Sequence, residues 1–284
     1  MAAGTGKSRA IALRTTAAAE APAAAREFER RAARAELLAG ETSVSAEPLR
    51  FAAGLFRTQA GVAGDIEGMN AREAFSGHLD RDVARFIDRS MDVVRFAAEH
   101  GPEPLAADAE DRLLDESAVA RTRLLVFWDE GRAATEDYLS RAMLRPYLET
   151  LRFVNRAPAR MHRRGRCPFC GGGPWISARR EGGDLEGGRR MLGCALCGTE
   201  WMFQRVLCPS CFEEDPTRLP SFSSDRHANV RVEACETCRR YVKSLDLSLD
   251  ARPIPEVDDL LSISLDLWAA EQGFTRLEPG LAGI

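Results

Sequence analysis

The stretch CALCGTEWMFQRVLCPSC, residues 194–211, contains two Cys-x-x-Cys pairs separated by ten residues. Two residues between cysteines allow a tight turn that points both sulfurs at one ion. Two such turns, facing each other across a β-hairpin, supply four thiolates in a tetrahedral arrangement. We therefore expect this stretch to contribute half of the ligands to each of two metal sites.

Two further Cys-x-x-Cys pairs complete the set of eight cysteines. A span of 23 residues separates Cys170 from Cys194, and a second span of 23 residues separates Cys211 from Cys235. These equal spans form an internal repeat of knuckle, hairpin and knuckle. The predicted metal ligands are Cys167, Cys170, Cys194 and Cys197 for the first site, and Cys208, Cys211, Cys235 and Cys238 for the second. A crossed pairing of the knuckles would use the same cysteines.

Four thiolates suit either zinc or iron, so the sequence predicts two metal ions, one per site, without choosing the element. Closed four-cysteine zinc sites are usually structural, whereas a rubredoxin-like iron site or a metal-free dithiol would be redox-active. Gly171 and Gly198 follow the second cysteine of their pairs, where a positive φ lets backbone N–H groups point at sulfur. Phe212 and Arg239 take this place in the second unit, which we therefore expect to form its turns differently. Arginines of the cysteine-rich region are candidates to offset the negative charge of the thiolates.

The first half of the chain has helical patterns. We expect an Ala-rich flexible leader at residues 1–25 and an all-α domain at residues 26–160, because good helix formers and apolar residues recur there at helical spacing. Pro146 is expected to kink or divide the helix that contains it. The expected helices cover residues 27–39, a segment from Pro48, and residues 83–98, 113–129 and 134–151.

The composition changes near Pro158, beyond which Gly, Arg and Cys become frequent and the patterns shorten to strand length. Residues 181–188 are Gly-rich and predict a turn or loop between two strands. We expect a multidomain α plus small-β protein, with two tandem rubredoxin-like, zinc-ribbon modules and a C-terminal helix that runs from about Asp258 to Gly273. The predicted limits are residues 161–206 for the first ribbon, 207–247 for the second, and 248–284 for the C-terminal helix and tail.

Several function classes are disfavoured by the composition. The net charge is −4, and no stretch of eighteen apolar residues is present, so we expect no membrane insertion. The N-terminal stretch lacks the apolar core of a secretory signal, which favours the cytoplasm. Residues 160–243 contain 15 Lys and Arg against 10 Asp and Glu, a net charge of +5 that is too modest to favour nucleic acid. No nucleophile–base pair is evident, so we predict no enzymatic activity.

Motifs beyond the cysteines point to one family. In chain order these are CPFCG at 167–171, CALCGTEW at 194–201, Arg205 with CPSC at 208–211, EACETC at 233–238, YVK at 241–243, DDL at 258–260, LDLWA at 265–269 and EQGF at 271–274. In this order they resemble the formate dehydrogenase accessory protein FdhE family over residues 167–274.

The resemblance implies a cytoplasmic, chaperone-like and non-catalytic maturation factor. It implies contact with the catalytic subunit of a molybdenum- or tungsten-dependent formate dehydrogenase, and it implies that the eight cysteines hold rubredoxin-like metal sites, with iron as a known occupant. Two alternatives stay open, namely a rubredoxin-like iron protein for redox or electron transfer and a nucleic-acid-binding zinc-ribbon protein. A homodimer is also left open.

Overall fold

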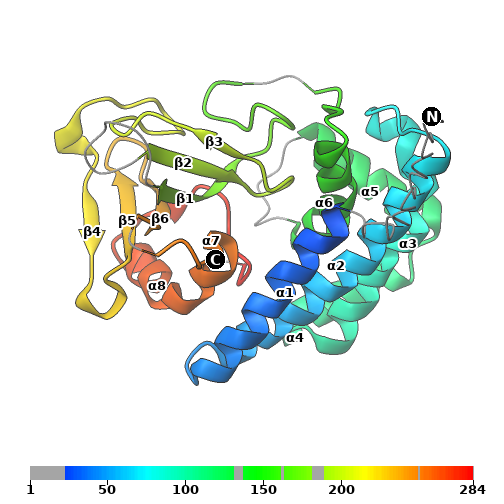
Figure 1. The fold of residues 1–284 in the computed structure, drawn as a ribbon, viewed down its shortest axis with the longest axis horizontal. Helices are drawn as coiled ribbons and strands as arrows, with labels where there is room; N and C mark the ends of the chain where they lie inside the picture. Colours follow the sequence, from blue (N-terminus) through cyan, green and yellow to red (C-terminus); the bar gives the residue numbers. More distant parts are fainter. Residues whose placement is uncertain (1–22, 131–136, 161–162, 181–188, 249, 284) are drawn as a thin grey trace, which may run out of the picture.

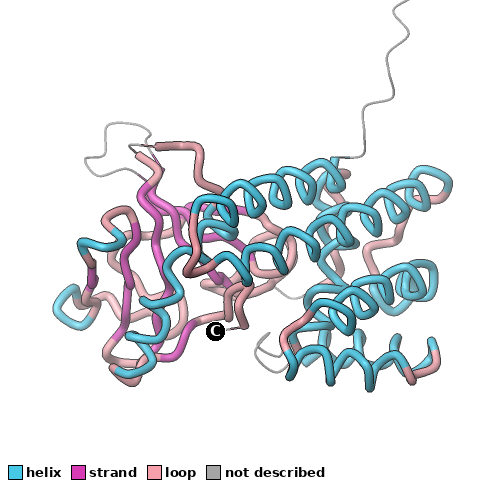
Figure 2. Tube along the Cα trace, turned by 90° about the horizontal axis from the view of Figure 1, so that it is seen from below, coloured by secondary structure: helices cyan, strands magenta, loops and turns pink. Residues whose placement is uncertain are grey.

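The computed structural model of the chain describes residues 23–130, 137–160, 163–180, 189–248 and 250–283. Residues 1–22 of the predicted leader and the predicted loop at 181–188 lie outside the described residues, whereas residues 23–25 of that leader already belong to the first helix. Helices gather on one side of the molecule, and the sheet with the C-terminal helices lies on the other (Figure 1). Figure 2, turned by 90°, shows the same division. None of the described helices is long and apolar enough to cross a lipid bilayer.

Within the described residues the N-terminal part consists of helices, as the sequence predicts, but it contains six helices where five are expected, and their limits differ. The expected helix at 113–129 begins at Ser117, and a separate helix before it was not predicted. Pro146 does not divide its helix, since α6 continues on both sides of it. The helices are α1 Ala23–Glu41, α2 Ala46–Arg72, α3 Leu79–His100, α4 Glu103–Leu113, α5 Ser117–Glu130 and α6 Tyr138–Phe153.

Helix α6 lies at the centre of this part, because every residue from Leu139 to Leu151 is buried. Its apolar residues pack into one hydrophobic cluster with α2, α3 and α5. Tyr147 of α6 donates a hydrogen bond of 2.7 Å to the Asp82 carboxylate, which also accepts hydrogen bonds from the backbone N–H groups of Ser76 and Gly77. Asp82 thereby fixes the turn that leads into α3.

The two cysteine units form one continuous sheet. Strands β1, β2 and β3 are antiparallel neighbours in the first unit, and β4, β5 and β6 are antiparallel neighbours in the second. Strand β1 pairs with β6 in parallel, with Ile176 opposite Lys243, so the order is β3-β2-β1-β6-β5-β4. The strands are β1 Pro174–Arg180, β2 Arg189–Cys194, β3 Glu200–Met202, β4 Ser221–Ser223, β5 Val230–Cys235, β6 Arg240–Asp246 and β7 Thr275–Arg276, the last paired in parallel with β6.

The predicted C-terminal helix is present but interrupted. It consists of α7 Pro255–Asp258, a 3₁₀ turn at Asp259–Ser262 and α8 Ile263–Glu271. A buried ionic network fastens this segment to β6. Lys243 is fully buried, and its Nζ donates to the Asp259 backbone oxygen at 3.0 Å and contacts the Asp266 carboxylate at 2.5 Å. Arg276 of β7 pairs with both carboxylates, so the charges inside this network are balanced against one another.

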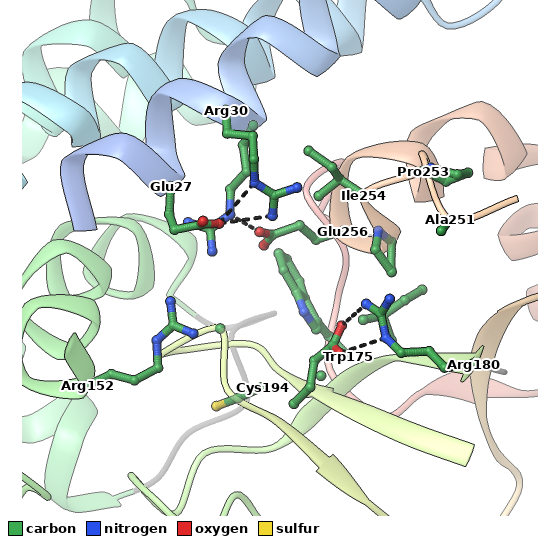
Figure 3. Close-up of a pocket in the computed structure, with 16 residues that line it drawn as sticks. Glu27, Arg30, Arg152, Trp175, Arg180, Cys194, Ala251, Pro253, Ile254 and Glu256 are labelled. Carbon is green, nitrogen blue, oxygen red and sulfur yellow. Dashed lines mark hydrogen bonds and ion pairs between the residues drawn. The ribbon is translucent and has the colours of Figure 1, made fainter. Parts of the chain in front are cut away.

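A second buried network joins the helical part to the C-terminal segment. Arg31 of α1 contacts Glu149 of α6 and Glu256 of α7, and Arg145 of α6 contacts the same two carboxylates. A polar cleft of about 420 Å³ lies beside this network, between α1, the strands β1 and β2, and residues 251–256 (Figure 3). The helical part and the sheet are therefore joined by charged groups as well as by apolar packing.

Candidate metal centres

Each Cys-x-x-Cys pair forms a tight turn closed by backbone hydrogen bonds. In the first knuckle the N–H of Gly171 donates to the carbonyl of Cys167 at 2.9 Å, and in the third the N–H of Phe212 donates to the carbonyl of Cys208 at 3.0 Å. The residue after the second cysteine has a positive φ in each knuckle, 72° at Gly171 and 65° at Gly198. These two values agree with the conformation that the glycines predict.

The expectation that the second unit forms its turns differently is wrong. Phe212 has a φ of 64° and Arg239 has a φ of 56°, so both adopt the left-handed conformation without being glycine. Such a backbone costs a non-glycine residue about 1 kcal/mol, which side-chain contacts can offset. The Arg164 guanidinium lies 4.6 Å from the Phe212 ring centroid, and the Arg239 guanidinium lies 3.8 Å from that of Phe274. The four knuckles therefore have one common geometry.

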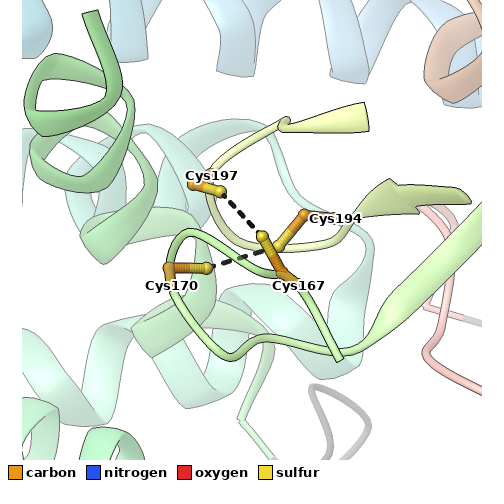
Figure 4. A group of neighbouring side chains, drawn as sticks. All are labelled: Cys167, Cys170, Cys194 and Cys197. Carbon is orange, nitrogen blue, oxygen red and sulfur yellow. Dashed lines mark hydrogen bonds between the residues drawn. The ribbon is translucent and has the colours of Figure 1, made fainter. Parts of the chain in front are cut away.

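The first four cysteines converge on one point (Figure 4). The Sγ atoms of Cys167 and Cys197 lie 3.6 Å apart, those of Cys170 and Cys194 lie 3.4 Å apart, and all four fall within 4.8 Å of one another. A tetrahedron with metal–sulfur bonds of 2.3 Å has sulfur–sulfur edges of about 3.8 Å. The separations match that tetrahedron and exceed the 2.05 Å of a disulfide. The grouping follows the sequential pairing of the knuckles.

The second four cysteines repeat this arrangement at the surface. The Sγ atoms of Cys208 and Cys238 lie 3.7 Å apart, and those of Cys211 and Cys235 lie 3.6 Å apart. The N–H of Ser210 donates to Cys208 Sγ at 3.4 Å, as the N–H of Leu196 does to Cys194 Sγ in the first group. The second group thus has the same donor set and the same backbone support.

The two groups differ in their surroundings. All four cysteines of the first group are fully buried and belong to the hydrophobic cluster that contains α6. In the second group Cys211 is exposed and Cys238 is only partly buried. The first site is therefore part of the junction between the helices and the sheet, whereas the second site faces solvent.

Two thiols of the first group resist ionisation when no cation is present. Burial raises the pKa of Cys194, and a hydrogen bond with Cys167 raises the pKa of Cys170. Hydrogen bonds from the other three thiols lower the pKa of Cys167 instead, so the ionised form of this cysteine is favoured. A divalent ion would stabilise four thiolates, and this all-sulfur donor set fits zinc or iron.

Several of the arginines predicted to offset the thiolate charge pair with carboxylates instead. Arg166, Arg179 and Arg180 pair with Glu278, Glu233 and Glu200. The sequence did not single out Arg160 as such a cation. Burial lowers the pKa of the Arg160 guanidinium below its usual value, although the charges of Cys170 and Cys194 act in the opposite direction.

Arg190 supports the metal region through the backbone. Its guanidinium donates to the carbonyls of Gln204 and Leu207 at 3.0 Å each, directly before Cys208. The same side chain pairs with Glu233 of β5 at 2.8 Å, so it ties the connection between the two cysteine units to the sheet. It therefore holds the chain where the second unit begins, rather than contacting a thiolate.

The sequence and the fold were compared with known proteins. Residues 166–205 match the family described as FdhE, central domain, and residues 206–281 match FdhE, C-terminal domain. A protein FdhE homolog of Aquifex aeolicus is 29% identical over 206 residues, which is 71% of either chain. Homologs of Pseudomonas aeruginosa and Pseudomonas putida are 37% and 39% identical over 119 residues, and those matches cover 38% and 37% of the relatives' own lengths.

A solved structure extends the likeness to the helices. The crystal structure of the FdhE protein from Pseudomonas aeruginosa has a TM-score of 0.65 at 23% identity, and the match covers 90% of this chain and 95% of that one. At this identity the match shows a shared fold, including the N-terminal helical part. The two matched domain models and the curated homologs account for the order of the motifs, and over residues 166–281 the chain is similar to the FdhE family.

Proposed function

We propose that this chain is an accessory protein required for formate dehydrogenase activity, and that it binds the catalytic subunit of that enzyme in the cytoplasm during assembly. Similarity to the FdhE family supports the accessory role. The single observation that carries the proposal is that the family match runs without a break through both cysteine units and the C-terminal helix, residues 166–281. The proposal assigns the chain no catalytic residue.

The proposal also gives each four-cysteine group one ion, zinc or iron, with all eight cysteines as ligands. The buried group at the helix–sheet junction would have a structural role, because four thiolates bound to a metal hold two knuckles and the adjoining α6 together. The sites would thereby shape the surface offered to a client protein rather than react with a substrate.

A gene deletion tests the accessory role. We expect a strain that lacks this chain to lose formate-dependent dye reduction, and a plasmid with the wild-type gene to restore it. Normal formate dehydrogenase activity in the deletion strain would contradict the proposal.

A pull-down with the catalytic subunit tests the partner. We expect wild type to retain the subunit and the Cys194→Ala/Cys197→Ala variant to lose it. The control is Arg57→Ala, which removes one member of an exposed ion pair on the helical part and should behave as wild type. If the cysteine variant retains as much catalytic subunit as wild type, binding of the subunit does not depend on the first metal site.

One observation favours a second candidate, a rubredoxin-like electron carrier. Electron transfer to a partner needs a metal site near the surface, and the exposed Cys211 places the second group there. Anaerobic purification followed by metal counting and optical spectroscopy separates the two functions. Two tightly held zinc ions without iron would exclude the electron carrier and leave the accessory role intact.

A further inference from the structure

The polar cleft at the junction of the two parts has an uneven charge balance. Its walls come from α1, the C-terminal end of α6, strands β1 and β2, and residues 251–256, and Cys194 lies in the lining (Figure 3). Polar and charged side chains dominate this lining, which favours a charged ligand over an apolar one. The charged groups beside the cleft indicate whether that ligand is an anion or a cation.

A buried network of three arginines and two carboxylates adjoins the cleft, and Arg31, Arg152 and Glu256 of this network belong to the lining. Arg31 lies 2.7 Å from Glu149, and Arg145 lies 2.8 Å from Glu149 and 2.9 Å from Glu256. Arg31 also pairs with Glu256, so both carboxylates are already occupied by two guanidinium groups. The third cation is Arg152, and with it the network contains one more positive than negative charge.

Arg152 has the longest carboxylate contact of the three cations, and its guanidinium also lies 4.4 Å from the Phe153 ring centroid. Its nearest carboxylate oxygen belongs to Glu149 and is 3.7 Å away, beyond hydrogen-bond distance. Its Nε is buried and donates no hydrogen bond, although the side chain keeps 26% of its accessible surface. Figure 3 shows the guanidinium pointing into the space between Glu27 and Cys194.

A buried N–H donor without an acceptor is costly. The Nε atoms of Arg31 and Arg145 also donate no hydrogen bond, but both of those guanidinium groups already lie within 3 Å of a carboxylate, so Arg152 is the group that can take an added acceptor.

The remaining charges of the lining do not supply that acceptor. Glu27 pairs with Arg30 at 2.9 Å, and Arg180 pairs with Glu200 at 2.8 Å, so these two pairs are balanced. Both pairs are partly exposed at the rim, where ion pairs are weak and can open to admit a ligand. Among the arginines and carboxylates, counted without the thiolates of the first metal centre, the unbalanced positive charge therefore stays with Arg152.

We infer that the cleft is a binding site for an oxyanion, a carboxylate or phosphate group, held by the Arg152 guanidinium. A planar guanidinium donates two parallel hydrogen bonds to such a group, and one bound anion would give the network three negative charges for three positive ones. Because Cys194 lines the same cleft, the occupant would lie directly behind the first metal centre. This inference does not depend on the accessory role.

Nuclear magnetic resonance of the arginine Nε–H groups provides the test. The metal-loaded protein, labelled with ¹⁵N and kept at low chloride, is titrated separately with inorganic phosphate and with acetate. We expect the Arg152 Nε–H signal to shift and to saturate with one anion per chain. Saturation by phosphate assigns a phosphate ligand, and saturation by acetate alone assigns a carboxylate. The absence of saturation by either anion, at tens of millimolar, overturns the inference.

Two variants make the assignment specific. Arg152→Met should weaken anion binding at least tenfold, and Arg152→Lys identifies the signal while keeping the charge. Arg164→Met is the matched control, since Arg164 also lies over a phenylalanine ring and at 3.9 Å from a single glutamate, but its contacts, Phe212 and Glu214, belong to the second cysteine unit. It should bind the anion as wild type does. If Arg152→Met instead lowers only metal affinity and leaves anion binding unchanged, Arg152 merely offsets the thiolates and the inference is wrong.

Discussion

At the scale of single residues, the residue after each second cysteine determines whether its knuckle can close. Two features of position 198 favour glycine. The φ angle of Gly198 is positive, and a Cβ there would lie 3.0 Å from Nη2 of Arg31. Any side chain at this position would therefore strain the backbone and displace a guanidinium of the network that joins the helices to the sheet. The small size of Gly198 connects the first metal centre to that network.

Gly198→Ala should destabilise the metal-loaded protein by about 1–2 kcal/mol, the usual cost of a left-handed backbone together with a close contact. The free energy of unfolding, measured by urea denaturation, checks this value. Gly64→Ala is the control, since Gly64 lies inside α2 with no atom within 4 Å of the added Cβ. That variant should be more stable than wild type by about 0.5–1 kcal/mol. Equal effects of the two substitutions would show that Gly198 has no special role.

The sequence predicted which cysteines gather, because a tight turn between two sulfurs depends only on local spacing. It did not predict that Phe212 and Arg239 would share the conformation of the glycines. Their left-handed backbone is accompanied by contacts with Arg164 and Phe274, which lie far away in the chain. The sequence did not single out Arg152 either. The excess of positive charge in its network depends on side chains from three separate segments of the chain.

At the scale of elements, α7 is a short helix that holds two larger parts together. Glu256 on α7 forms an ion pair with Arg31 of α1 and accepts a hydrogen bond from Arg145 of α6. Burial acts to raise the pKa of Glu256. The charges of Arg145 and Arg31 outweigh this effect, so the pKa lies below its usual value. A lowered pKa means that the carboxylate stabilises the fold above the pKa of the unfolded state, so the contribution is fully present at neutral pH.

Glu256→Gln should destabilise the protein by about 3–5 kcal/mol, because Arg31 and Arg145 would keep their buried charges with one carboxylate fewer. We also expect faster proteolysis between the helical part and the sheet, detected by mass spectrometry of the fragments. Glu36→Gln breaks an exposed ion pair of α1 with Arg57 and should change stability by less than about 0.5 kcal/mol. Similar unfolding free energies for both variants would refute the role of α7 as a connection.

Helical periodicity in the sequence revealed the long helices but not the pairing of the two cysteine units. The strands inside each unit are close in the chain, so the cysteine spacing and the turn residues predict their pairing. The β1–β6 pair joins residues 67 positions apart, such as Ser177 and Ser244, and no local pattern encodes it. The break in the C-terminal helix has a comparable cause, since Lys243 of β6 takes the backbone oxygens of Asp259 and Ser262 as acceptors.

At the scale of the whole molecule, the two cysteine groups should respond differently to a chelator. A buried site opens only when its surroundings open, whereas a surface site is reached directly. We expect two ions per chain and a biphasic release, with the second site emptied at least tenfold faster. A colorimetric chelator that changes absorbance on metal binding measures both phases.

The Cys208→Ser/Cys238→Ser variant assigns the two phases. It should retain one ion per chain, lose the fast phase and keep the slow one, with the helical circular dichroism unchanged. A single phase in wild type, or a fast phase that persists in the variant, would contradict the difference in burial between the two groups.

The parallel β1–β6 pair also sets the order in which the chain can fold during its synthesis. Strand β1 leaves the ribosome first, and its neighbour β6 follows 67 residues later, about 3–13 s at ordinary translation speeds. Strand β7 comes later still. In that interval the first knuckles can already bind metal, but one edge of β1 has no partner and is open to strands of another nascent chain.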